Sequence, residues 1–582
     1  MVIRYRKLRA ILWTALCWQC VSSTLTSNTI LQNTTHVSQN AARQTLAEVS
    51  FAERTSVDNL LENYAKAKDR LTQLLRHDYG NEYYAMIFEP GSSRGRTVIQ
   101  PPGGFDVLSN SWDRLKARIM IKLIDVLRSP TPQPFVWATG GHSSAAGHGN
   151  FYDESYTAVL TRNVKQIFEA VGMQFIGRNY AMGGSDAAPE AAWCNEEIFG
   201  TDLDVLVWDY GMTDGRDVSK MAMYCYRAAL NPSKPACIAL HCGKPSQQPR
   251  ASALRTLEQL GATVLISNEN VLEQCMDAIP ESQGISDYEL QKMPLYVRHF
   301  KCGGLVESGD PYCGAEKYNH TDCTQRKFMA KWHQGWRFHA LHGNLMALFL
   351  TELVGDALQS LKDSTQSLED LQKDLIREEN ERYDLLTTSP LPTYFEDMVK
   401  DRGDLQLEHI FKSPNFCHTA RVPAEIRHKG ILTGGPPGDL FHYDEGVPEG
   451  QARNVENDSE FMWLVQDPTT RQKCDIPLNL DNKDYFYVKG MDGKKKLILP
   501  NDAEVSEYGR GQTPIGLIAM CLSVCDWGKC PKGDVQIEQY EQNEGTIEIN
   551  GQKVTGFTKI GRCSFLRHGD GHYFTPNSDF QV

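Results

Sequence analysis

A serine stands in a glycine-rich turn that directly follows a short apolar run. Ser143 lies within residues 140–150, a segment of small residues behind the apolar residues 135–138. Between a strand and a helix, a serine hydroxyl lies near backbone amides that can bind a developing oxyanion, and small neighbours leave room for a carbonyl group. The pattern favours attack on an ester. A tight turn without a chemical role is the alternative, and a phosphate-binding loop is disfavoured because the P-loop lysine and the GxGxxG spacing are missing.

A histidine is needed to activate such a serine, because the hydroxyl is a weak nucleophile until a base within about 3 Å accepts its proton. His333 lies in the loop before the apolar helix that ends the region of alternating strands and helices. His339 and His342 fall in the first turns of that helix and are favoured as packing or capping residues. His142 and His148 are alternatives for the base, but they are so close to the serine in the chain that reach and angle are harder.

The segments that must position these residues alternate between helices and strands. Apolar residues at intervals of three and four predict helices over residues 112–126 and 156–171. Short apolar runs predict strands at residues 135–138, 174–176, 203–208, 237–240 and 263–266. This alternation predicts a parallel sheet covered on both faces, in which ligands bind at the carboxyl ends of the strands. Two further polar turns, at residues 179–186 and 209–215, are expected beside the first.

In this order, the four segments resemble the SGNH (GDSL-like) hydrolase family. The first block of that family reads Gly-Asp-Ser, three residues and Gly, and residues 141–147 fit with His142 in place of the aspartate. The resemblance covers about residues 112–350 and implies a flavodoxin-like αβα sandwich. It also implies that Ser143 is the nucleophile, that Gly184 supplies an oxyanion amide, and that His333 is the base.

Two positions depart from the family pattern. The third block usually reads Gly-x-Asn-Asp, but here Thr213 replaces the asparagine, so the oxyanion donor becomes a hydroxyl with one proton to give. The aspartate expected three residues before the base is Ala330. The carboxylate that orients the imidazole then comes from elsewhere, with Asp322 and Asp310 as candidates, or is absent and leaves a Ser-His dyad.

Composition narrows the class of protein. The chain has 582 residues, 41% of them hydrophobic, with 60 basic and 73 acidic side chains and a formal net charge of -13. This sign of charge repels phosphate backbones, so no nucleic-acid partner is expected. No cofactor and no metal is expected, and a structural zinc site is a weak alternative because paired CxxC knuckles are missing.

The amino-terminal residues predict export. A basic stretch is followed by a short apolar run over residues 10–21, the layout of a signal peptide over residues 1–23. A signal anchor is the alternative, although the run is shorter than the roughly 20 residues that span a bilayer, and membrane contact is expected only if the leader stays uncleaved. Fourteen further cysteines favour disulfides, and Asn33, Asn319 and Asn457 stand in glycosylation sequons. We expect a glycoprotein that is secreted or lies at the cell surface.

Patterning divides the chain into five regions. After the leader come a flexible and helical region (24–110), the SGNH-like α/β domain (111–355), an amphipathic helical segment (356–400) and a loop-rich, then β-rich accessory domain (401–582). Residues 355–386 are expected to form an exposed amphipathic helix. Short alternating runs at residues 484–488, 496–499 and 546–551 predict strands of the accessory domain.

Together these features predict a secreted serine esterase that hydrolyses acyl esters, with acetyl esters favoured, through an acyl-enzyme. Its substrate would be an acylated extracellular glycan or a small ester. An O-acyltransferase would use the same residues and differ in whether water is excluded from the acyl-enzyme. A catalytically decayed glycan-binding or cell-surface protein is the alternative from another class, with aromatic residues of the accessory domain stacking on sugars.

Overall fold

The computed structural model describes most of the chain between residues 56 and 392. The described ranges are 56–89, 97–104, 110–147, 154–181, 186–215, 217–241, 248–280, 286–298 and 334–392, with residues 300, 395 and 412 and short strands beyond residue 431. The leader, the three sequons, His148, Gly184, Ala330 and His333 lie outside the described residues, as do Asp310 and Asp322.

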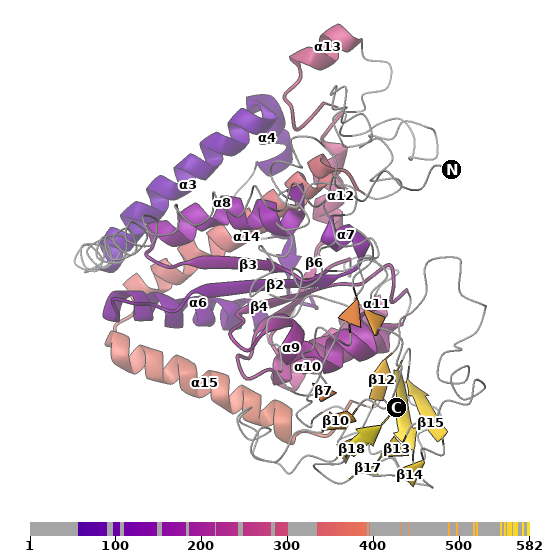
Figure 1. The fold of residues 1–582 in the computed structure, drawn as a ribbon. Coiled ribbons are helices and arrows are strands. Elements are labelled where there is room, and N and C mark those ends of the chain that lie inside the picture. The colour runs from indigo at the N-terminus through magenta and orange to yellow at the C-terminus, as the bar shows by residue number, and fades with distance from the viewer. Residues whose placement is uncertain are drawn as a thin grey trace, which may run out of the picture.

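A six-stranded, mostly parallel sheet organises the described part of the chain (Figure 1). Its spatial order is β1-β6-β5-β4-β2-β3, with β1 antiparallel to β6 and all other neighbours parallel. The strands are β1 (Ile99–Gln100), β2 (Phe135–Gly141), β3 (Phe175–Asn179), β4 (Val205–Asp209), β5 (Ala236–Ala239) and β6 (Val264–Ser267). The predicted α/β fold class and its five parallel strands are confirmed.

Helices cover both faces of this sheet. Alternate residues of each strand point to opposite faces, and in β2 Phe135 and Trp137 join one hydrophobic cluster while Val136 and Ala138 join another. The first cluster includes apolar residues of α3 (Val57–Tyr79), α4 (Asn81–Phe88), α6 (Ser111–Arg128), α8 (Tyr156–Ala170) and α14 (Trp336–Asp363). The second includes η2 (Ala187–Ala191), α9 (Asn195–Phe199), α10 (Val218–Leu230) and α11 (Gln248–Gln259). Figure 1 shows α8 and α14 on one side of the sheet and α10 and α11 on the other.

The remaining described helices are α7 (Ser143–Ala146), α12 (Glu269–Asp277), α13 (Asp287–Lys292) and α15 (Leu368–Thr388). The prediction of a single helix over residues 355–386 is wrong, because α14 ends at Asp363 and α15 begins at Leu368. Ser367 caps α15 by accepting a hydrogen bond from the Asp370 amide at 3.1 Å, and Ser364 accepts one from the Gln366 amide at 3.2 Å. Serine side chains that bond to nearby amides favour caps over helix interiors. α14 also passes the boundary expected at residue 355.

Short antiparallel strands follow in the carboxyl-terminal part of the chain. They are β7 (Leu432–Thr433), β8 (Phe441–His442), β9 (Tyr487–Val488), β10 (Lys496–Ile498), β11 (Gly516–Leu517), β12 (Ala519–Cys521), β13 (Glu548–Ile549), β14 (Gln552–Lys553), β15 (Gly556–Ile560), β16 (Cys563–Arg567), β17 (Tyr573–Phe574) and β18 (Asp579–Gln581). The three runs predicted as strands contain β9, β10 and β13. The accessory domain itself stays a prediction.

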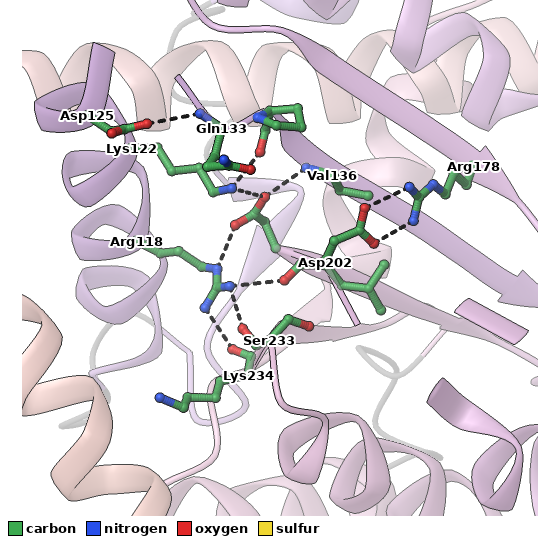
Figure 2. Close-up of polar contacts among 12 residues, drawn as sticks. Arg118, Lys122, Asp125, Gln133, Val136, Arg178, Asp202, Ser233 and Lys234 are labelled. Atoms are coloured by element: carbon green, nitrogen blue, oxygen red, sulfur yellow. Dashed lines mark hydrogen bonds and ion pairs between the residues drawn. The ribbon is translucent and has the colours of Figure 1, made fainter. Parts of the chain in front are cut away.

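A buried ion-pair network joins helices to the amino ends of the strands (Figure 2). Asp204, just before β4, is fully buried and lies 2.8 Å from Arg118 and 2.9 Å from Lys122, both on α6. The Arg118 guanidinium also donates to the Lys234 carbonyl at 3.1 Å and to Glu379 of α15 at 2.8 Å. The network therefore ties α6 and α15 to the end of the sheet opposite Ser143.

Two expectations from the sequence, disulfides and membrane contact, can be compared with the described residues. Cys225, Cys237 and Cys275 are buried thiols, and the sulfurs of the first two lie 2.6 Å apart. The expected disulfides stay a prediction, because most of the cysteines lie outside the described residues. Within the described ranges, no helix combines the length and the apolar character needed to cross a bilayer.

Candidate functional site

The candidate site lies where the order of the parallel strands reverses. β2 pairs with β3 on one side and with β4 on the other. In open parallel sheets, the carboxyl ends of such strands form the crevice in which ligands bind. Gly141, the last residue of β2, pairs with Asp209, the last residue of β4, and the His142 amide donates to the Asp209 carbonyl at 3.1 Å. Ser143 follows as the first residue of α7.

The turn between β2 and α7 depends on small residues. A Cβ atom on Gly141 would lie 2.7 Å from the Asp209 carbonyl oxygen and would also clash with the Ala145 methyl group. Glycine therefore permits the close approach of α7 to β4 that brings Ser143 to this edge. Ser143 itself is largely buried, with 9% of its surface exposed.

His142 has a structural contact that bears on its role. Its Nδ1 atom accepts a hydrogen bond from the Ser144 amide at 3.1 Å, which caps α7. This bond turns Nε2 toward Asp209, at 3.9 Å from Oδ1. Burial lowers the pKa of His142, so the neutral ring is favoured. A neutral ring that accepts at Nδ1 carries its proton on Nε2, so neither nitrogen is left to accept the Ser143 proton, and His142 is a poor candidate for the base.

Beyond Asp209, a row of alternating acidic and basic side chains continues along the same edge. His241, two residues after β5, places Nε2 3.5 Å from Asp209 Oδ1 and Nδ1 3.6 Å from Glu269 Oε1. Glu269 begins α12 just after β6 and accepts a hydrogen bond from the Ser267 hydroxyl at 2.6 Å. One member of this row therefore lies at or just after the carboxyl end of each of the strands β4, β5 and β6. We call these three residues the acid–base row (Asp209, His241 and Glu269).

The charges in the acid–base row stabilise each other. Burial alone would lower the pKa of His241, but the contacts with Glu269 and Asp209 outweigh it and raise that pKa to about 9. Burial would raise the pKa of Glu269, but His241 and the Ser267 hydroxyl lower it to about 2. At neutral pH, His241 is therefore an imidazolium and Glu269 a carboxylate.

Aromatic side chains pack at the buried side of the acid–base row. The Tyr156 hydroxyl of α8 donates to Asp209 Oδ2 at 2.9 Å. Asp209 is 2% exposed, and its Oδ1 atom has no hydrogen-bond partner among the described residues. His342 and His339 of α14 pack against the Tyr156 ring, with centroid distances of 5.0 and 5.9 Å. Burial and the nearby His241 lower the pKa of His342 to about 4, so it stays neutral, as a packing residue would.

The loop after β4 carries the expected oxyanion residue and a buried carboxyl. The Thr213 hydroxyl donates to the Tyr210 carbonyl at 3.2 Å, which engages its single proton. Asp214 accepts hydrogen bonds from the Ala187 amide at 2.9 Å and from the Trp208 indole at 3.1 Å. Burial raises the pKa of Asp214 to about 7 against these contacts. Asp214 thereby holds the residues that follow the second polar turn.

The structure places Ser143 and Thr213 at the same edge of the sheet, while His333 and Gly184 lie outside the described residues. Sequence reasoning missed His241 and Glu269 as parts of this edge. The signal that could have found them was present, because each stands within three residues of a predicted strand, and residues after parallel strands converge. Among the described residues, no three His, Cys, Asp or Glu side chains are arranged to hold a metal ion.

The chain matches no protein-family model, no curated protein and no solved structure.

Proposed function

We propose that the chain is a serine esterase of the SGNH type, built on a flavodoxin-like αβα sandwich and exported through its leader. The position of Ser143 carries the proposal. This serine follows β2 directly, at the point where the strand order reverses and beside the buried carboxylate of Asp209. The parallel strands run in the order 2-1-3-4-5 when numbered along the chain, an order that flavodoxin-like sheets use.

The proposed reaction has two halves. The Ser143 oxygen attacks the carbonyl carbon of the ester while the imidazole of His333 accepts the hydroxyl proton. The tetrahedral intermediate then expels the alcohol, which takes that proton and leaves the acyl group on Ser143. Water, deprotonated by the same imidazole, attacks the acyl-enzyme; the bond from the acyl carbon to the Ser143 oxygen then breaks, that oxygen takes the proton back from the imidazole, and the carboxylic acid is released. Gly184 and Thr213 are the proposed oxyanion donors, and an acetylated extracellular glycan is the proposed substrate.

The described surroundings of Ser143 support this chemistry in two ways. The serine lies at an edge where water is largely excluded, because Asp209 and Tyr156 beside it are almost fully buried. In such an environment, fixed charges act more strongly on a developing oxyanion than they would in water. Within the acid–base row, the imidazolium of His241 is the fixed positive charge at this edge.

Hydrolysis of 4-nitrophenyl acetate by the purified full chain tests the proposal. Ser143→Ala should lower kcat by at least about 1000-fold, because the nucleophile is lost, and should abolish labelling by a fluorophosphonate probe. Ser144→Ala is the matched control, since it removes the neighbouring hydroxyl and leaves the nucleophile. His333→Gln should lower kcat like Ser143→Ala. Equal activity of Ser143→Ala and the parent chain would rule out the proposed nucleophile. Product analysis with an added sugar acceptor separates hydrolysis from acyl transfer.

A second candidate function is favoured by one observation. The Thr213 proton is engaged by the Tyr210 carbonyl, so the third block lacks a ready oxyanion donor. A chain with a weakened site could serve as a glycan-binding protein at the cell surface. Binding to a glycan array that survives Ser143→Ala, together with no probe labelling of the parent chain, would favour this function over the esterase.

A further inference from the structure

The loop after β4 lacks the amide that the family pattern places there, yet a positively charged side chain lies beside it. Thr213 donates its only proton to the Tyr210 carbonyl. A Cβ atom on Gly211, two residues earlier, would lie 3.7 Å from the Cβ atom of His241. The Cβ atom of His241 therefore borders the loop whose proposed oxyanion donor, the Thr213 hydroxyl, is engaged by a carbonyl group.

Contacts with two carboxylates and an unusual backbone conformation hold His241 in this position. Its two ring nitrogens face Asp209 and Glu269, which fixes the ring between β4 and the start of α12. Its backbone has a φ of +55°, a left-handed conformation that residues other than glycine seldom adopt. Such strained backbone concentrates at functional sites, where the surrounding structure holds it.

The three side chains of the acid–base row differ in the fraction of their surface that is exposed. The His241 side chain is 33% exposed, whereas those of Asp209 and Glu269 are 2% and 6% exposed. Of the three side chains, that of His241 is therefore the most exposed at this edge. Because both ring nitrogens point at carboxylates, His241 would act through its charge and not through a donated hydrogen bond.

We propose that His241 is an electrostatic residue of this site, whose imidazolium stabilises the negative charge that develops on the carbonyl oxygen of an ester attacked by Ser143. Asp209 and Glu269 are positioning residues that keep the imidazole in place and charged. The inference rests on the proposed esterase function. It assigns to a histidine just after β5 the task that the missing amide of the third block would perform.

The proposal predicts an alkaline limit to activity. The groups that face His241 are Asp209 on β4, Glu269 at the start of α12, Arg250 on α11, His342 on α14 and His142. The carboxylates raise its pKa to about 9, and Arg250 opposes them. Activity should therefore fall as pH rises through about 9, where the imidazolium loses its proton. Removing one carboxylate should move this limit to lower pH.

Three variants of the full chain test the proposal through kcat and KM for 4-nitrophenyl acetate between pH 6 and pH 10, with Ser143→Ala as the blank. His241→Asn removes the charge with a residue that tolerates left-handed backbone. It should lower kcat about 10- to 100-fold, in the range for losing one electrostatic contact to the oxyanion, with KM nearly unchanged and no fall near pH 9. His241→Arg keeps a charge that does not titrate, so it should recover part of kcat and also lack the fall.

Glu269→Gln should shift the alkaline fall to lower pH, and this readout remains if His241→Asn fails to fold. His77→Asn, an exposed substitution on α3, is the control and should match the parent chain. An active, Ser143-dependent enzyme whose alkaline fall is unmoved by Glu269→Gln and by His241→Asn would overturn the role of His241 alone. A parent chain that neither hydrolyses the ester nor takes the probe at Ser143 would overturn the esterase function, and the role of His241 with it.

Discussion

At the scale of single residues, Asp214 shows how the loop after β4 is held. This carboxyl is buried and accepts hydrogen bonds at both oxygens, from the Ala187 amide and the Trp208 indole. An N–H group therefore points at each oxygen. The residue shares a loop with Thr213, and its partner Ala187 comes shortly after the turn that contains Gly184. Asp214 thus holds the loop that carries Thr213, one of the proposed oxyanion donors.

Asp214→Asn should lower the free energy of unfolding by about 1–3 kcal/mol, because the new amide group would point one N–H at another and leave a buried donor unpaired. Urea unfolding at pH 5.5 checks this, since burial raises the pKa of Asp214 to about 7 and both side chains are then mostly neutral. Asp217→Asn is the matched control, because Asp217 caps α10 at the surface and asparagine caps as well. Equal stabilities of the two variants would contradict the prediction.

The contact between His241 and Glu269 should make stability depend on pH. His241 has a folded pKa of about 9, above its ordinary 6.5, so its contribution is complete below pH 6.5 and is lost as pH rises through 9. Glu269 has a folded pKa of about 2, below its ordinary 4.5, so its contribution is complete above pH 4.5 and is lost as pH falls through 2. The two contributions coincide between about pH 4.5 and pH 6.5.

Glu269→Gln should therefore cost most stability near pH 6 and clearly less near pH 10. We expect about 1–3 kcal/mol at pH 6, less than for a fully buried pair because the His241 ring is one-third exposed and screened by water. Chemical unfolding at the two pH values measures the difference. Glu381→Gln, at an exposed position on α15, should cost little at either pH. A cost that is the same at pH 6 and pH 10 would show that the ion pair does not contribute.

At the scale of elements, α6 is fixed to the sheet by charge as well as by its apolar face. Arg118 and Lys122 of α6 share the buried carboxylate of Asp204 (Figure 2). Arg118 extends the contact to Glu379 of α15. The nearby Asp204 and Glu379 outweigh burial and raise the pKa of Arg118, which keeps the guanidinium charged. A single side chain thus connects one strand and two helices.

Arg118→Ala should destabilise the chain by about 3–5 kcal/mol, because it leaves a buried carboxylate with only one of its two cations. Arg128→Ala, on the last turn of the same helix, is the control. Arg128 is 44% exposed and lies 3.7 Å from Glu369, so its loss should cost less than about 1 kcal/mol. Thermal unfolding followed by circular dichroism compares the two, and similar melting temperatures would refute the role given to the buried network.

At the scale of the whole molecule, one helix that precedes the α/β region in the chain and one that follows it both pack onto that region. α3 docks on α14, where the Tyr64 hydroxyl donates to the Thr351 carbonyl at 2.9 Å. α15 docks beside α10, where the Tyr383 hydroxyl donates to the Leu230 carbonyl at 3.0 Å. Its backbone also passes so close to Gly261 that a Cβ atom there would clash with the Arg382 carbonyl.

Gly261→Ala should therefore destabilise the molecule more than Gly104→Ala, by about 1–3 kcal/mol, the usual cost of forcing extra volume into a packed site. Both glycines have positive φ values, +107° and +79°, but no atom lies within 4 Å of a Cβ atom at Gly104. The difference between the variants thus reports the contact with α15. Thermal unfolding and the rate of tryptic cleavage within α15 measure it, and equal values would mean that the helix accommodates the methyl group.

The five parallel strands could be predicted from local spacing, and so could the place of Ser143 at a strand end, whereas the short edge strand β1 was not predicted. The helix over residues 355–386 could not be predicted correctly, because leucine periodicity continues across the serines that cap α15. His241 and Glu269 were missed because neither segment carries a motif that marks the residue for chemistry. Nothing in either segment tells which strand will lie beside it.

The sequence by itself determined the five parallel strands and the helices over residues 112–126 and 156–171, since side-chain spacing decides which face of a segment can be buried, and it marked Ser143 as the candidate nucleophile. Only the tertiary structure decided that Asp209, His241 and Glu269 form one row, and that α15 closes on Gly261. The reason is physical. Contacts between residues far apart in the chain depend on the order in which strands pair, and that order is set by the packing of the whole sheet.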